Sequence, residues 1–123
     1  MSIKVEIGEL REAVAACGSY AFLLTVTEDG RPHAVSLHVE WDGDMLVARP
    51  GPRTLANAER SPEVSFLWPE SGRAGFTLFV NGPAELRTDG DTAMVAVKPT
   101  TAVLHKTPEG EVQAPGCVPV FGK

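Results

Sequence analysis

Two arginines and a threonine surround a Pro-Gly-Pro segment in the middle of the chain. Arg49 ends an apolar run, and Arg53 and Thr54 follow the second proline, where a helical pattern begins. The free N–H groups at the start of a helix favour an anion, and guanidinium groups bind phosphate through paired hydrogen bonds. The residues alone leave two interpretations open: a phosphate site, or a surface turn in which Thr54 only caps the helix.

Other chemistry has little support in the sequence. The chain contains no nucleophile elbow, phosphate-binding P-loop or zinc-protease motif. His33, His38 and His105 are too scattered to predict a metal site, and nothing marks a nucleophile beside a base. Cys17 and Cys117 lack the spacing of zinc ligands, so we expect two free thiols, with a disulfide as the alternative.

The elements that must position these residues are mostly strands. Residues 32–41 alternate strictly between apolar and polar types, which is the period of a strand with two different faces. His33 and His38 are five positions apart, so a regular strand points them to opposite faces. Strands are predicted at 20–27, 32–41, 45–49, 63–69, 76–87, 93–99 and 101–106, and short helices at 8–18 and 54–62. This pattern is typical of a small β-barrel or sandwich, with a bulge or sharp bend at residues 81–83.

Size and composition indicate one globular domain spanning residues 1–123. The chain is 43% hydrophobic and 22% charged, which is close to the average for folded domains. A net charge of −5 argues against a nucleic-acid partner. The chain contains no apolar run of membrane-spanning length and no signal peptide, so we expect a cytoplasmic protein without a membrane partner. Residues 107–123 show no period and are predicted to form an extended C-terminal arm.

The order of these parts resembles the pyridoxamine 5′-phosphate oxidase-like family, the FMN-binding split barrels. The resemblance rests on "FLLTVTEDGRPHAVSLHVEWDGDMLV" followed by "RPGPRTLANAERSPEVSFLW", and it covers roughly residues 10–88. It implies a mainly β fold: a six-stranded antiparallel split β-barrel with two short helices. It also implies a homodimer with FMN at the subunit interface and a small-molecule substrate.

The same resemblance implies a set of cofactor-binding residues, and we assign no catalytic residue and no metal ligand. The strand along the FMN corresponds to residues 33–38, the end of the next strand approaches the flavin, and Pro52, Arg53 and Thr54 match the phosphate-binding loop. A polar position that reaches the cofactor matches Thr77. The implied cofactor contacts are His33, Val35, Ser36, His38, Arg49, Arg53, Thr54 and Thr77.

The chain also departs from the family pattern. The oxidases carry arginine and lysine at the positions of His33 and His38, and Ser-Arg-Lys at the positions of Pro52, Arg53 and Thr54. Their C-terminal substrate-binding segment has no counterpart here, so pyridoxamine phosphate is not the expected substrate. We therefore predict a flavin-dependent oxidoreductase of another small substrate. The alternatives are a deazaflavin-dependent reductase and a non-catalytic split barrel that binds a flavin, another small ligand or nothing.

Overall fold

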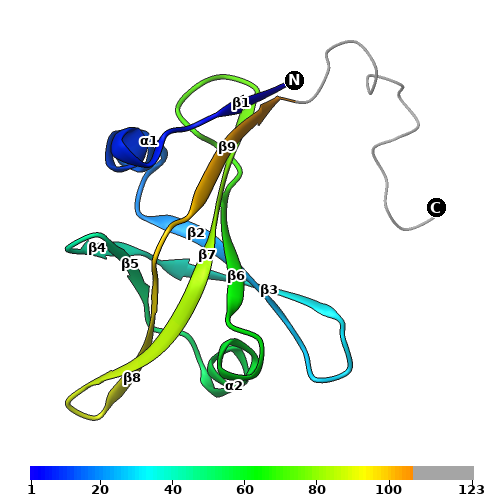
Figure 1. The fold of residues 1–123 in the computed structure, drawn as a ribbon, viewed down its shortest axis with the longest axis vertical. Coiled ribbons are helices and arrows are strands. Elements are labelled where there is room, and N and C mark those ends of the chain that lie inside the picture. The colour runs from blue at the N-terminus through cyan, green and yellow to red at the C-terminus, as the bar shows by residue number, and fades with distance from the viewer. Residues whose placement is uncertain (107–123) are drawn as a thin grey trace.

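The computed structural model describes residues 1–106 as nine antiparallel strands in one curled sheet with two α-helices (Figure 1). The predicted arm and Cys117 lie outside the described residues. The strands are β1 Ser2–Lys4, β2 Tyr20–Val26, β3 Pro32–His38, β4 Glu40–Asp42, β5 Met45–Ala48, β6 Glu63–Trp68, β7 Phe76–Asp89, β8 Thr92–Val97 and β9 Thr101–Lys106. The helices are the 3-10 turn η1 Ile7–Glu9, α1 Leu10–Cys17 and α2 Pro52–Arg60.

The sheet has the strand order β3-β2-β6-β7-β8-β5-β4, and β9 pairs with both β7 and β1. The two strands at the ends of this path, β3 and β4, are consecutive in the chain. The two edges of the curled sheet are therefore joined by the polypeptide chain itself and not by hydrogen bonds between the two strands. This confirms the predicted mainly β split barrel. Among the described residues, no helix is both long and apolar enough to cross a membrane.

The nine strands exceed the six of the expected barrel, and the two that were not among the seven strands predicted from the sequence pattern have local causes. The predicted strand 32–41 is two strands, because the chain changes partner at Val39: β3 pairs with β2, whereas β4 pairs with β5. Val39 is buried, and its N–H donates to the carbonyl of Ser19 at 2.8 Å, which holds this corner. The second is β1, which has only three residues and therefore too few for a periodic pattern.

The predicted bulge lies opposite β7 and not within it. β7 is continuous, but its partner changes from β9 to β8, and Gly82 and Pro83 lie opposite the three residues 98–100. The carbonyl of Pro83 accepts the N–H of Lys98 at 3.1 Å. A Cβ atom on Gly82 would lie 2.1 Å from the carbonyl oxygen of Lys98, so this crossing requires glycine.

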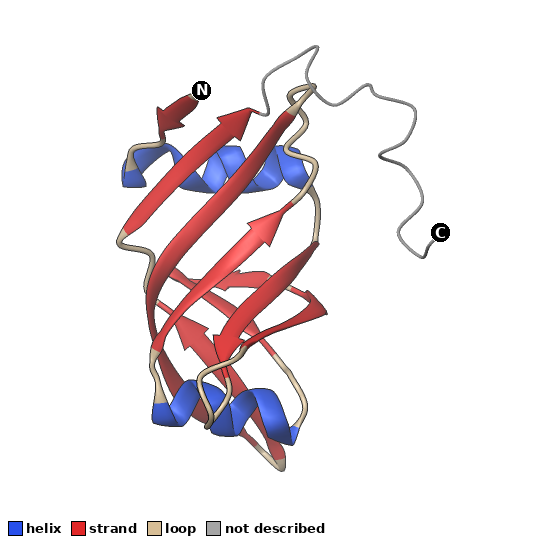
Figure 2. Ribbon diagram, turned by 90° about the vertical axis from the view of Figure 1, so that its right-hand side faces the viewer, coloured by secondary structure: helices blue, strands red, loops and turns tan. Residues whose placement is uncertain are grey.

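The core fills the inside of the curled sheet, and the helices lie at opposite ends of it (Figure 2). Leu23, Phe66 and Val80 are fully buried on the inner face, and α1 adds Leu10 to the same cluster. Helix α2 begins two residues earlier than predicted, because Pro52 occupies its first turn, where a fixed φ and a missing N–H cost nothing. The sheet thereby holds α2 beside the end of the β2–β3 hairpin.

Candidate functional site

Helix α2 and the β2–β3 hairpin lie at the same end of the molecule (Figure 1). Residues of both line an open groove of about 740 Å³. Its basic side chains are Arg31 from the hairpin and Arg53 and Arg60 from the helix, and its acidic ones are Glu28 and Asp29. Three arginines against two carboxylates give the groove a formal charge of +1, in a chain whose net charge is −5. The groove is therefore a local positive site on an acidic protein.

The start of α2 leaves Arg53 available to a ligand. Gly51 caps the helix in an extended conformation, its carbonyl accepts the N–H of Leu55 at 3.1 Å, and no side chain bonds the free N–H groups of the first turn. Arg53 is exposed, and its side chain has no hydrogen bond or ion pair within residues 1–106. Thr54 is only 3% exposed and lies within the first turn, so the alternative in which it caps the helix is wrong.

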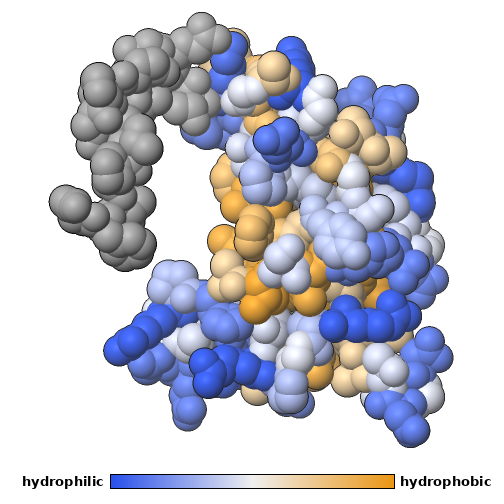
Figure 3. Space-filling model, turned by 180° about the vertical axis from the view of Figure 1, so that it is seen from behind, coloured by the Kyte–Doolittle hydropathy of each residue, from blue (hydrophilic) through white to orange (hydrophobic). Residues whose placement is uncertain are grey.

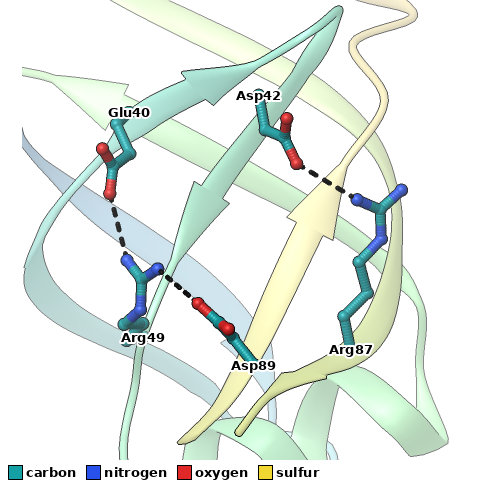
Figure 4. Close-up of polar contacts among 5 residues, drawn as sticks. All are labelled: Glu40, Asp42, Arg49, Arg87 and Asp89. Carbon is teal, nitrogen blue, oxygen red and sulfur yellow. Dashed lines mark hydrogen bonds and ion pairs between the residues drawn. The ribbon is translucent and has the colours of Figure 1, made fainter.

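Arg49 lies on a different groove, one lined by β4, β5 and the β7–β8 hairpin. Its guanidinium contacts the carboxylates of Glu40 at 3.0 Å and Asp89 at 3.9 Å (Figure 4). Nearby, Arg87 contacts Asp42 at 3.5 Å. The two arginines that flank the Pro-Gly-Pro segment therefore do not converge on one anion within a single chain, and the charge of Arg49 is already compensated.

The predicted cofactor strand β3 divides its candidates between two faces. The register pairs Ser36 with Phe22 and His38 with Tyr20 on the outer face, where the rings of His38 and Tyr20 meet edge to face at 5.4 Å. Val35 packs against the core on the inner face, and His33 shares that face. The predicted opposite orientation of His33 and His38 is thus confirmed.

His33 has an unusual environment for a strand histidine. It lies opposite Thr25, whose side chain is 3% exposed, and its Nδ1 is buried without a hydrogen-bond partner in the described part of the chain. Buried polar atoms nearly always have a hydrogen-bond partner. The unpaired Nδ1 of His33 is therefore a candidate for a hydrogen bond to a bound ligand.

Thr77 is remote from the basic groove. It lies six residues from Pro83 along β7, which is about 20 Å in an extended strand. The part of β7 around Pro83 is the part that lies near α2, since the N–H of Ala84 donates to the carbonyl of Pro62, two residues after the helix. The hydroxyl of Thr77 donates to the carbonyl of Pro69 at 3.2 Å. Within one chain, Thr77 and Arg53 cannot contact the same small ligand head group.

A search against protein-family models matches residues 8–114 to the family described as pyridoxamine 5′-phosphate oxidase. The chain belongs to the pyridoxamine 5′-phosphate oxidase family. The uncharacterised proteins of Mycobacterium bovis and Mycobacterium tuberculosis are each 33% identical to it over 127 aligned positions, covering 89% of both chains.

Solved structures show the same fold at low sequence identity. The FAD-binding protein of Mycobacterium smegmatis aligns with a TM-score of 0.63 at 16% identity, covering 86% of this chain and 100% of the other. A FAD-binding protein of Mesorhizobium loti gives 0.64 at 13% identity, covering 88% and 98%. An F420 reductase gives 0.57 at 21% identity, covering 68% and 87%.

This member of the family also has groove residues that the sequence reasoning missed. Asn57 is 3% exposed, and its side-chain nitrogen donates to the hydroxyl of the buried Thr25 at 3.1 Å. Its oxygen accepts from Arg60 at 2.9 Å. Arg53, Asn57 and Arg60 are spaced i, i+4 and i+7, which places them on one helical face; that spacing was the available signal.

Within residues 1–106, neither of the two shifted pKa values points to catalysis. Burial raises the pKa of the Cys17 thiol to about 11, and its Sγ donates to the carbonyl of Ala13 at 3.2 Å, so Cys17 is an inert thiol. Hydrogen bonding to Lys98 lowers the pKa of Asp44, which lies outside the basic groove. Over residues 1–106, no group of three or more potential metal ligands comes together.

Proposed function

We propose that the protein binds a flavin nucleotide, FMN in its simplest form, with the phosphate at Arg53, and uses it as an oxidoreductase of a small molecule. The observation that carries this proposal is the Arg53 side chain, which has no partner within residues 1–106, beside the start of α2, where no side chain caps the first N–H groups, inside a groove of about 740 Å³. Three features of this groove favour a bound phosphate: free backbone N–H groups, a free guanidinium and enough volume for a ligand. The names of the structural neighbours support it, since two are FAD-binding proteins.

The residues present fit such a cofactor. The groove volume falls within the range of about 300–1,000 Å³ that is typical of small-molecule sites. The buried, unpaired Nδ1 of His33 supports a polar partner on the same side of the barrel as α2, because the opposing Thr25 bonds to Asn57 of that helix. When bound, a flavin supplies hydride transfer, and the protein supplies binding, orientation and electrostatics. Arg53 binds the phosphate, and β3 orients the rest of the cofactor.

A deazaflavin is the second candidate cofactor. The F420 reductase shares the fold, and a deazaflavin nucleotide presents the same kind of phosphate to Arg53. His33 and His38, where the oxidase pattern has arginine and lysine, also favour a departure from the usual cofactor chemistry. A non-catalytic flavin-binding protein is the remaining candidate, and turnover distinguishes it from an enzyme.

We also infer that the protein is a homodimer with the cofactor at the subunit interface. The outer face of the sheet carries a continuous apolar row formed by Phe22, Leu67, Phe79 and Val103 on adjacent strands. Tyr20 is 66% exposed and Phe22 37%. Figure 3 shows hydrophobic residues gathered near the middle of the face seen from behind. Burying such a face requires a partner, and a second copy brings its own Thr77 toward a cofactor that one chain cannot span.

An absorption spectrum and a flavin titration test this proposal. We expect the purified protein to be yellow, or to take up added FMN with quenching of flavin fluorescence. Turnover of a reduced nicotinamide with an electron acceptor then identifies an enzyme, and a parallel titration with a deazaflavin identifies the alternative cofactor. A colourless protein that binds neither cofactor at micromolar concentrations contradicts the proposal.

A further inference from the structure

The positive charge of the basic groove extends well beyond the start of α2. Arg53 lies in the first turn of the helix and Arg60 at its end, and seven residues of helix span about 10 Å. Arg31 reaches the same groove from the β2–β3 hairpin on the other wall. One phosphate at Arg53 accounts for one of these arginines and leaves two unexplained.

Arg60 is held in place by two acceptors, of which Asn57 is buried. One of its terminal nitrogens donates to the side-chain oxygen of Asn57 at 2.9 Å and to the carbonyl of Val26 at 3.2 Å. Asn57 is itself fixed by its bond to the buried Thr25. The Nε and the second terminal nitrogen of Arg60 have no partner in the described structure. A guanidinium that is held through one nitrogen and keeps its other N–H groups free is suited to binding an anion.

Arg31 is oriented by the hairpin but only weakly paired. Its backbone N–H donates to the hydroxyl of Thr27 at 2.9 Å, which fixes the turn. Its Nε lies 3.2 Å from Asp29, but the two side chains are 80% and 65% exposed. Exposed ion pairs contribute little, so an anionic ligand can compete with Asp29 for this guanidinium.

We propose that Arg31 and Arg60 form a second anion position in the groove, so that it takes a flavin nucleotide with two phosphates as well as the single phosphate of FMN. This rests on the proposed flavin-binding function and specifies the class of cofactor. FMN occupies the position at Arg53 alone. The two phosphates of a dinucleotide such as FAD are adjacent, and FAD occupies both positions because the Arg60 guanidinium folds back to Asn57, which lies about one helical turn from Arg53.

Titrations with riboflavin, FMN and FAD test this, because the three carry no phosphate, one and two. Arg53→Ala should weaken FMN and FAD alike. Arg31→Ala and Arg60→Ala should weaken FAD about tenfold or more and leave FMN within about twofold, since a charge-assisted hydrogen bond is worth at least that factor. Arg73→Ala removes the same charge from a guanidinium that lies over the ring of Phe76, away from the groove, and should change neither affinity.

The outcomes separate this proposal from the one on which it rests. If Arg31→Ala and Arg60→Ala change FMN and FAD by the same factor, or change neither, the second anion position is wrong while flavin binding stands. If the unmodified protein binds none of the three flavins, both proposals fall. Thermal melting checks each variant for folding. If Arg60→Ala unfolds, the ratio for Arg31→Ala decides alone, because Arg31 lies on an exposed turn.

Discussion

The protein has two arginine-bearing grooves of opposite character. The groove beside α2 holds three arginines and two carboxylates, with formal charge +1, and the Arg53 side chain has no partner in the part of the chain that the structure describes. The groove over β5 and β8 holds two arginines and three carboxylates, with formal charge −1, and its Arg49 contacts Glu40 and Asp89. An arginine beside a groove is therefore not sufficient evidence for an anion site. What matters is whether the fold has already supplied its counter-charge.

The comparison is tested most strongly by removing one arginine from each groove. Arg53→Ala should weaken FMN binding by about 1.5–3 kcal/mol, because it removes a charge-assisted contact to phosphate. Arg49→Ala should leave the affinity within about twofold, since Arg49 already has carboxylate partners. Fluorescence titration measures both. An equal loss in the two variants would show that Arg49 turns toward the cofactor, and the distinction between the grooves would fail.

The second prediction concerns how rigidly each groove is built. Asn57→Ala should lower the free energy of unfolding by about 1–2 kcal/mol, because it removes the buried hydrogen bond to Thr25 and the partly buried one from Arg60. Glu59→Ala, an exposed change on the same helix, should stay within about 0.5 kcal/mol. Urea unfolding compares the two. Equal stabilities would mean that the buried network does not support the basic groove.

The contrast between the two grooves shows what sequence reasoning reaches. The period-two alternation of 32–41 predicted the sheet and the opposite faces of His33 and His38, because side-chain direction in a strand is a local property. The separation of Arg49 from Arg53 was not predictable in this way. It depends on which residues β4 and the β7–β8 hairpin bring beside Arg49, and those contacts span up to 40 positions of sequence.

Asn57 is a second residue whose role depends on contacts between segments that are distant in the sequence. Its spacing from Arg53 and Arg60 was visible, but an asparagine on a short helix is usually a solvated residue. Only the packing of α2 against β2 buries it and gives its amide two partners. The start of α2 was also placed two residues late, because the pattern of apolar residues marks the packed face and not the first turn.

The third prediction concerns a variant in which the acidic groove loses carboxylates and so becomes more positively charged, like the basic groove. The double substitution Glu40→Gln and Asp89→Asn removes both carboxylates that contact Arg49. Stability should change by less than about 1 kcal/mol, because these pairs are partly exposed. Inorganic phosphate should then protect the double variant against thermal unfolding more than it protects the parent protein. Identical protection in the two proteins would show that free arginines on this face do not create an anion site.

The smallest expected effect is a pH dependence near the acidic groove. Asp44, in the turn between β4 and β5, accepts a hydrogen bond from Lys98, and this contact lowers the pKa of Asp44 below its ordinary value of 3.8. A carboxyl whose pKa is lower in the folded state stabilises the fold above its unfolded pKa, and that contribution is lost as the pH falls through the folded pKa. Asp44→Asn should therefore reduce the loss of stability below about pH 4.

Acid unfolding followed by circular dichroism measures this difference. The effect should be slight, because Asp44 and Lys98 are both exposed and salt screens their attraction. Asp91→Asn, on the exposed β7–β8 turn, is the matched control and should leave the midpoint of acid unfolding unchanged. If the two variants shift the acid transition equally, the cause is overall charge and not the Asp44–Lys98 contact. The Asp44–Lys98 contact would then contribute nothing specific to the acid stability of the fold.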